Sequence, residues 1–186
     1  MPHIDLNADL PGIRSLVAYR PETGRSLYEL AETLLGENSS LSRAESELIA
    51  AYVSALNECH FCKSSHASAS RHLYGDEAGT VDAVLTDIDA APVSGLLKAL
   101  LNIAAKVRKD GRTVMEEDVA EARRHGASDR QIHDAVLIAA SFSMFNRYVD
   151  GLATWAPAEP EDYVEMGRLM AENGYKARFD QVIEGR

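Results

Sequence analysis

Apolar residues recur every three or four positions along almost the whole chain, and this spacing is the feature that most restricts its fold. Side chains at that spacing lie on one face of an α-helix. No alternating run rich in Val, Ile or Thr is long enough to indicate a β-sheet. The sequence therefore predicts an all-α protein.

Three capping-box patterns mark helix starts, because in each a Ser or Thr and a Glu or Gln three residues later accept hydrogen bonds from each other's backbone N–H groups. The patterns are Ser42 with Glu45, Thr113 with Glu116, and Ser128 with Gln131. They predict helices over about 42–57, 113–126 and 128–152. Apolar spacing, initial prolines and closing glycines predict further helices at about 24–35, from the cysteines to 74, at 78–86, 92–108 and 161–173, the last closed by Gly174.

The chain has 186 residues and 46% apolar content, which is enough for one compact domain with a real core. We therefore interpret residues 1–186 as a single domain. Residues 1–22 contain three prolines and are interpreted as an extended N-terminal arm. Residues 41–152 form the predicted helical core, and 153–186 are a C-terminal extension.

The charge balance excludes polyanionic partners. Nineteen basic against twenty-nine acidic residues give a net charge of −10, which repels nucleic acids and anionic membranes. The N-terminus lacks a basic region followed by an apolar stretch, and the longest apolar run, 135–140, is too short to cross a bilayer. We expect a soluble, cytoplasmic protein, where a close cysteine pair is more often catalytic or metal-binding than structural.

The two cysteines stand in the pattern C-x-x-C followed by a histidine: Cys59, Cys62 and His66. On a helix these three positions fall within about 60° of one another, at roughly 100° per residue. The thiolate is the attacking species in thiol chemistry, and an ordinary cysteine is only slightly ionised at neutral pH. A helix N-terminus alone is too weak to change this, so His66, one turn after Cys62, is the predicted base.

A histidine used as a base is usually oriented by a carboxylate, and Glu47 on the preceding helix is the candidate. A short connection around residue 57 would turn the cysteine helix back along the helix of Glu47. The apolar neighbours of Glu47 indicate burial, where an unpaired carboxylate would be costly. The sequence therefore predicts that Glu47 pairs with His66.

Two other interpretations of the cysteine pair stay open. A C-x-x-C can be half of a zinc site, but the histidines outside this segment, at 3, 72, 125 and 133, are scattered along the chain. The pair could also be two inert, buried thiols. Thiol redox chemistry is the interpretation that we favour, with no cofactor and no metal.

Together, Glu47, Cys59, Cys62 and His66 form the pattern E-x11-C-x2-C-x3-H, which resembles the AhpD-like alkylhydroperoxidases of the carboxymuconolactone decarboxylase superfamily. The similarity is strongest over 41–75 and extends in pattern through 113–152. The peroxidase-related subfamily, which carries extra terminal segments, is the most similar group. The resemblance implies an AhpD-like helical fold, with a helix pair that carries the glutamate and the C-x-x-C-x-x-x-H segment.

The same resemblance implies reduction of hydroperoxides. Cys62 would attack the peroxide and become a sulfenic acid, and Cys59 would supply a proton and then close a disulfide. Glu47 and His66 would relay protons. The partners implied are a hydroperoxide, a dithiol or thioredoxin-like reductant, and further copies of the chain in a trimer or hexamer. One departure is that Phe61 stands where the family often has a histidine, with His60 just before it.

Two alternative functions remain at this point. A lyase like the superfamily's carboxymuconolactone decarboxylases would not use a dithiol. A non-enzymatic zinc or interaction module would use the cysteines structurally. The stripe of Phe142, Met144, Phe145 and Tyr148 favours a core or interface role over a substrate pocket.

Overall fold

The computed structural model describes residues 1–185, in which nine α-helices and three short 3-10 helices occur and no strand is found. The prediction of an all-α protein is confirmed. The α-helices are α1 (Ile13–Tyr19), α2 (Pro21–Leu35), α3 (Arg43–Leu56), α4 (His60–Tyr74), α5 (Gly79–Thr86), α6 (Gly95–Asp110), α7 (Glu116–Arg124), α8 (Asp129–Gly151) and α9 (Val164–Glu184). The 3-10 helices are η1 (Gly75–Glu77), η2 (Gly111–Thr113) and η3 (Pro160–Tyr163).

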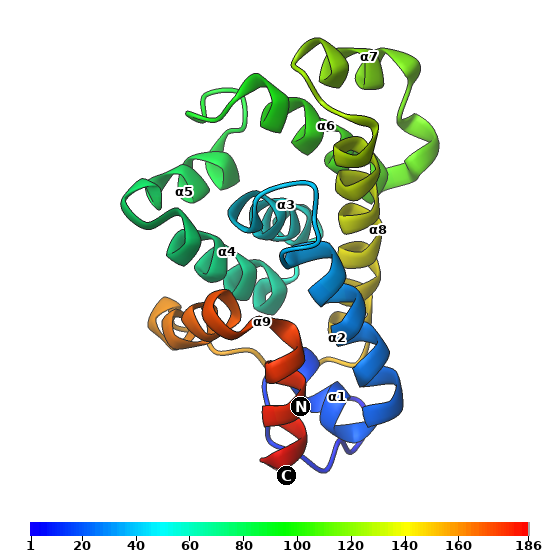
Figure 1. Cartoon of the computed structure of the whole chain (residues 1–186). Helices are drawn as coiled ribbons and strands as arrows, with labels where there is room; N and C mark the ends of the chain where they lie inside the picture. The colour runs from blue at the N-terminus through cyan, green and yellow to red at the C-terminus, as the bar shows by residue number, and fades with distance from the viewer. Residues whose placement is uncertain (186) are drawn as a thin grey trace.

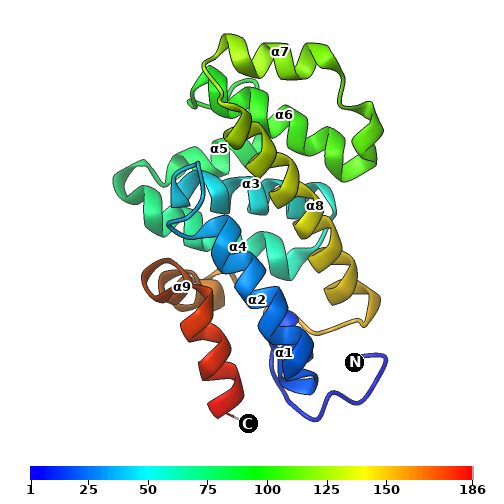
Figure 2. The same ribbon diagram turned by 45° about the vertical axis from the view of Figure 1, so that its right-hand side comes forward.

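Helices α3 and α4 occupy the centre of the molecule and pack on each other more extensively than any other pair (Figure 1). Helix α8 runs along α3 and α6, and α7 caps the far end. Helices α1, α2 and α9 gather at the opposite end, where both termini also lie (Figures 1 and 2). No helix within residues 1–185 is both long and apolar enough to span a bilayer.

Two of the three predicted capping boxes are present. The Ser42 hydroxyl accepts a hydrogen bond from the Glu45 N–H at 3.2 Å, and Glu45 accepts the Ser42 N–H at 3.0 Å. Ser128 and Gln131 form the same pair of bonds at the start of α8. These two predictions are confirmed because a capping box depends only on residues within one helical turn.

The third box and one helix start were predicted wrongly. Thr113 ends η2, where its hydroxyl donates to the Asp110 carbonyl, and α7 starts three residues later. There the Asp118 carboxylate accepts the Met115 N–H at 2.8 Å, so the acid at 118 sets the start of α7. Helix α6 likewise begins after Ser94, whose hydroxyl accepts the Leu97 N–H, and Pro92 precedes it.

The N-terminal segment is not a fully extended arm. Helix α1 forms within it, and Pro21 occupies the first turn of α2, where its missing N–H costs nothing. Leu16 and Val17 of α1 are each 1% exposed. Burial of these side chains holds the short helix, which is too short to be stable alone.

The last helix does not stop at Gly174. Helix α9 continues to Glu184 across a kink at this glycine, where φ is 69° and ψ is −171°. Figure 2 shows the two parts of α9 pointing in different directions. The Glu32 carboxylate of α2 accepts the backbone N–H of Tyr175 at 2.6 Å and caps the second part. The predicted end was therefore a bend, supported by a residue from a distant helix.

Helix α3 provides the buried wall beneath the cysteines. Its residues Leu48, Ile49, Ala50, Ala51 and Val53 are all fully buried. Glu58, with φ of 61°, turns the chain sharply between α3 and α4. The two helices then run antiparallel. Near the end of α4, the Ser70 hydroxyl donates a hydrogen bond to the Ala44 carbonyl at the start of α3.

A glycine in the N-terminal segment gives a stability prediction. Gly12 has φ of 56°, and a Cβ placed on it would lie 2.1 Å from the Phe61 ring. We expect Gly12→Ala to lower the free energy of unfolding by about 2 kcal/mol or more, through strain and overpacking. Urea unfolding would measure the loss. Gly79→Ala is the control, since its Cβ meets nothing within 4 Å; equal stability of the two variants would contradict the close contact.

Candidate functional site

The structure brings Glu47 and His66 into contact. Glu47 lies on α3 and His66 faces it from α4, with Nδ1 of His66 2.6 Å from Oε2 of Glu47. Glu47 is 1% exposed and His66 is 8% exposed. The predicted pairing is therefore present in the buried helix interface. With Nδ1 directed at the carboxyl group, Nε2 is the ring nitrogen available to other partners.

Tyr175 completes this group. Its hydroxyl donates to Oε1 of Glu47 at 2.6 Å and lies 3.3 Å from Nδ1 of His66. The Tyr175 and His66 rings stack with an interplanar angle of 15°. Burial and the adjacent Glu47 raise the pKa of Tyr175 well above its usual value, so the hydroxyl remains a donor. Both oxygens of the buried carboxyl group thus have a hydrogen-bond partner.

Tyr175 is absent from the residues that we predicted for the site. The helix was expected to end at Gly174, which placed Tyr175 outside it. One signal was available in the sequence: Tyr175, Phe179 and Val182 continue the helical apolar spacing beyond the glycine. That spacing predicts a buried face for the second half of α9, although it does not predict contact with Glu47.

The two cysteines lie at the start of α4 as free thiols. Cys59 is the residue just before the helix and Cys62 lies in its first turn. They are 1% and 4% exposed. The pKa of Cys59 is raised, chiefly by its hydrogen bond to Cys62 and next by burial. Cys59 therefore holds its proton tightly beside the sulfur of Cys62.

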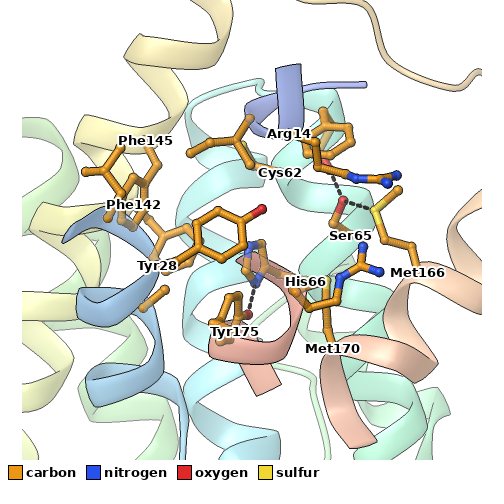
Figure 3. A pocket seen from close by; sticks show the side chains of 15 residues that line it. Arg14, Tyr28, Cys62, Ser65, His66, Phe142, Phe145, Met166, Met170 and Tyr175 are labelled. Atoms are coloured by element: carbon orange, nitrogen blue, oxygen red, sulfur yellow. Dashed lines mark hydrogen bonds between the residues drawn. The ribbon is translucent and has the colours of Figure 1, made fainter. Parts of the chain in front are cut away.

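A partly open pocket reaches Cys62. Its cavity volume is about 60 Å³, which is room for a few water-sized groups. Residues from α1, α2, α4, α8 and α9 line it (Figure 3). They include Arg14, Tyr28, Cys62, His66, Phe142 and Tyr175. Cys59 does not line the pocket, so of the two sulfurs only Cys62 faces it.

Aromatic residues of α8 and α4 shape this pocket. Phe142 meets the His66 ring edge-on at 4.5 Å between ring centres, and Phe145 packs on Phe142. Both phenylalanines are buried and also line the pocket, so they serve as core and as pocket wall. Phe61 lines the pocket too, whereas His60 is exposed and its Nε2 lies 3.2 Å from the Pro157 carbonyl oxygen.

The four predicted site residues thus lie together at the α3–α4 interface, two of them on the pocket wall. Their catalytic roles stay predictions. Among the side chains of residues 1–185, no group of three or more His, Cys, Asp or Glu is arranged to hold a metal ion. The scattered histidines do not join the cysteine pair in such a group.

Known proteins resemble this chain in sequence and in fold. The profile of the Carboxymuconolactone decarboxylase family matches residues 21–106, which include all four predicted site residues. An alkylhydroperoxidase AhpD core from Ralstonia eutropha, an uncharacterized peroxidase-related protein, is 27% identical with a TM-score of 0.74. That comparison covers 86% of this chain and 82% of the other. The chain is thus similar to the carboxymuconolactone decarboxylase family over these residues and to the AhpD core in its fold.

The chain has the AhpD-like fold. An uncharacterized peroxidase-related protein from Silicibacter is 28% identical, with a TM-score of 0.74 over 85% of this chain and 81% of that one. A protein of unknown function from Agrobacterium tumefaciens, 23% identical, shares the fold with a TM-score of 0.65 over 77% of this chain and 97% of that one. No curated protein matches the sequence significantly.

Proposed function

We propose that this AhpD-like protein reduces hydroperoxides through a dithiol–disulfide cycle of Cys59 and Cys62. The observation that carries the proposal is the Glu47–His66 hydrogen bond beside a pocket that Cys62 lines. A base held in one orientation on the wall of the same pocket as a thiol is what nucleophilic thiol catalysis needs. The peroxidase-related structural neighbours support the same reaction class.

In the first step, Nε2 of His66 takes the proton of the Cys62 thiol, and the sulfur attacks the terminal oxygen of the hydroperoxide. The O–O bond breaks and an S–O bond forms, so Cys62 becomes a sulfenic acid. The leaving alkoxide takes the proton of Cys59 and departs as an alcohol. The raised pKa of Cys59 keeps that proton in place until a strong base such as the alkoxide forms.

In the second step, the Cys59 thiolate attacks the sulfur of Cys62. An S–S bond forms, the S–O bond breaks, and the hydroxide takes the proton held by His66 and leaves as water. The disulfide is then reduced by thiol exchange with a dithiol or thioredoxin-like protein. Overall, one hydroperoxide and two thiols give an alcohol, water and a disulfide.

The cellular setting and the assembly belong to the same proposal. A reducing cytoplasm would return the disulfide to the free thiols. We also expect a homo-oligomer, a trimer or hexamer, with the site near a subunit boundary. Light scattering coupled to size-exclusion chromatography would measure the mass of the assembly, and a monomer at micromolar concentration would contradict this part.

Mass spectrometry of the thiols tests the chemistry directly. Treated with one equivalent of tert-butyl hydroperoxide, the reduced protein should lose two hydrogen atoms and form an internal disulfide. Cys59→Ser should instead gain one oxygen atom on Cys62, which dimedone would trap as the sulfenic acid. Unmodified thiols in the treated wild-type protein, with the fold intact, would refute the proposal.

A decarboxylase-like lyase is the second candidate, and the description of the matched family profile is the observation that favours it. Such a lyase does not need the dithiol. Its activity on a carboxymuconolactone should survive Cys62→Ser, whereas peroxide reduction should not. The two candidates are therefore separated by one variant and two substrates.

A further inference from the structure

The wall of the Cys62 pocket contains two guanidinium groups that the redox chemistry does not use. Arg14 comes from α1 and Arg178 from the second part of α9. In Figure 3, Arg14 lies on the side of the pocket where Cys62, Ser65 and Met166 are also found. Most of the other lining side chains near them are apolar, among them Ile13 and Met170.

Arg178 is buried and Arg14 is half-buried, and no acidic side chain within residues 1–185 lines the pocket beside them. Arg178 is only 8% exposed, and Nε of Arg14 is buried with no hydrogen-bond partner in the described part of the chain. Burial first, and then the charge of Arg14, lower the pKa of Arg178. Two like charges that lie close together and partly out of water repel each other and destabilise this part of the fold.

The nearby groups compensate these charges only weakly. Nη1 of Arg178 lies 3.3 Å from the amide oxygen of Gln181, a neutral partner. Glu165 acts on Arg178 from a distance, but it is exposed and already bonded to Arg168 at 2.7 and 2.8 Å. The Tyr175 hydroxyl is used by Glu47.

The composition makes this lack of an acid informative. The chain has twenty-nine acidic residues against nineteen basic ones. Other arginines, such as Arg71, Arg112 and Arg123, each form an ion pair with an aspartate at the surface. Within residues 1–185, no acidic side chain lines the Cys62 pocket. A bound anion would supply the missing partner, because a guanidinium pairs well with a planar carboxylate.

We infer that Arg14 and Arg178 bind the carboxylate of the substrate, so that the protein acts on small hydroperoxides that carry a carboxylate on an apolar spacer. This inference rests on the proposed function. The arginines would hold one end of the molecule and the apolar lining its middle, with the hydroperoxide at Cys62. The cavity of about 60 Å³ encloses only a few atoms of such a molecule, so the spacer is short and part of the substrate lies toward the open side of the pocket.

A matched substrate pair tests the inference. We would compare tert-butyl hydroperoxide with 4-hydroperoxy-4-methylpentanoate, which adds a short chain with a carboxylate. The wild-type kcat/KM should be roughly tenfold or more higher for the carboxylate, since charge-assisted hydrogen bonds are stronger than neutral ones. In Arg14→Gln and Arg178→Gln this preference should fall by a similar factor, and Arg14→Lys should restore part of it. Arg112→Gln removes an exposed, paired charge elsewhere and should keep the preference.

Binding without turnover separates this inference from the proposed function. We would titrate the reduced protein with 4-methylpentanoate and with the neutral 4-methylpentanamide, following ligand signals by saturation-transfer NMR. The acid should bind roughly tenfold more tightly than the amide, and Arg14→Gln should remove the difference. If neither hydroperoxide reacts but the acid still binds through Arg14, the redox proposal fails and the anion site stands. Equal binding of acid and amide by the wild-type protein would overturn the inference, whatever the peroxide activity.

Discussion

Cys62→Ser is expected to abolish hydroperoxide turnover, with kcat/KM falling by at least about a thousandfold. A serine hydroxyl is not ionised near neutral pH and does not form the oxygen adduct that sulfur forms. Cys62 is also the only one of the two thiols that lines the pocket, so Cys59 cannot replace it without movement of α4. Hydroperoxide consumption with excess dithiothreitol would measure the loss.

Cys59→Ser is the matched control for this variant. It removes a sulfur of the same size from the same turn, but from behind the pocket wall. It should consume one equivalent of hydroperoxide per site and then stall as the sulfenic acid. The roles would be reversed if Cys62→Ser still consumed one equivalent in a single turnover and Cys59→Ser consumed none. Both thiols would be irrelevant if each variant turned over like wild type.

The central helix pair was predictable because its signals are local. The capping box at Ser42 fixes the start of α3, and Glu58 provides the sharp turn that returns α4 along it. Once the two helices are antiparallel, Glu47 and His66 face each other. The sequence pattern E-x11-C-x2-C-x3-H contains that geometry within twenty residues, and no distant segment is needed to infer it.

The segments outside the core were predicted less well because distant residues determine them. The second part of α9 exists as a continuation of the first because Glu32, 143 residues from Tyr175, accepts its N–H. Thr113 failed as a cap because Asp118 already satisfied the Met115 N–H nearby. Where a helix begins or bends thus depends on which side chain accepts the free backbone N–H groups in the folded structure. Helix propensity within one turn does not reveal that side chain.

The same distant contacts build the pocket. Helices α1, α2 and α9 contribute Arg14, Tyr28, Met166 and Tyr175 to the wall that they share with the start of α4. The core supplies the sulfur and the base, and the terminal segments supply the surfaces that a substrate would contact. Reaction class therefore follows from the local motif, whereas substrate choice depends on the segments that sequence patterns describe poorly.

Glu47→Gln is expected to slow the oxidation of Cys62 by about a hundredfold, within the range that a positioned acid or base contributes. The amide keeps the size of the buried side chain, but its NH2 group can donate to Nδ1 of His66 where the carboxyl oxygen accepted. The imidazole would then carry its proton on Nε2, and the nitrogen that takes the thiol proton would be lost. Stopped-flow measurement of the first turnover isolates this step from the reductant.

Tyr175→Phe is the control for the glutamate variant. It removes the hydrogen bond from Tyr175 to Glu47 but leaves the 2.6 Å contact between Glu47 and His66 in place. We expect a loss of about tenfold or less, since only the support of the carboxyl group is weakened. Nitrogen NMR of the His66 ring gives a readout that a purely structural role would not change. The proton should move from Nδ1 to Nε2 in Glu47→Gln and stay on Nδ1 in Tyr175→Phe. An unchanged tautomer together with a wild-type rate in Glu47→Gln would remove Glu47 from the mechanism.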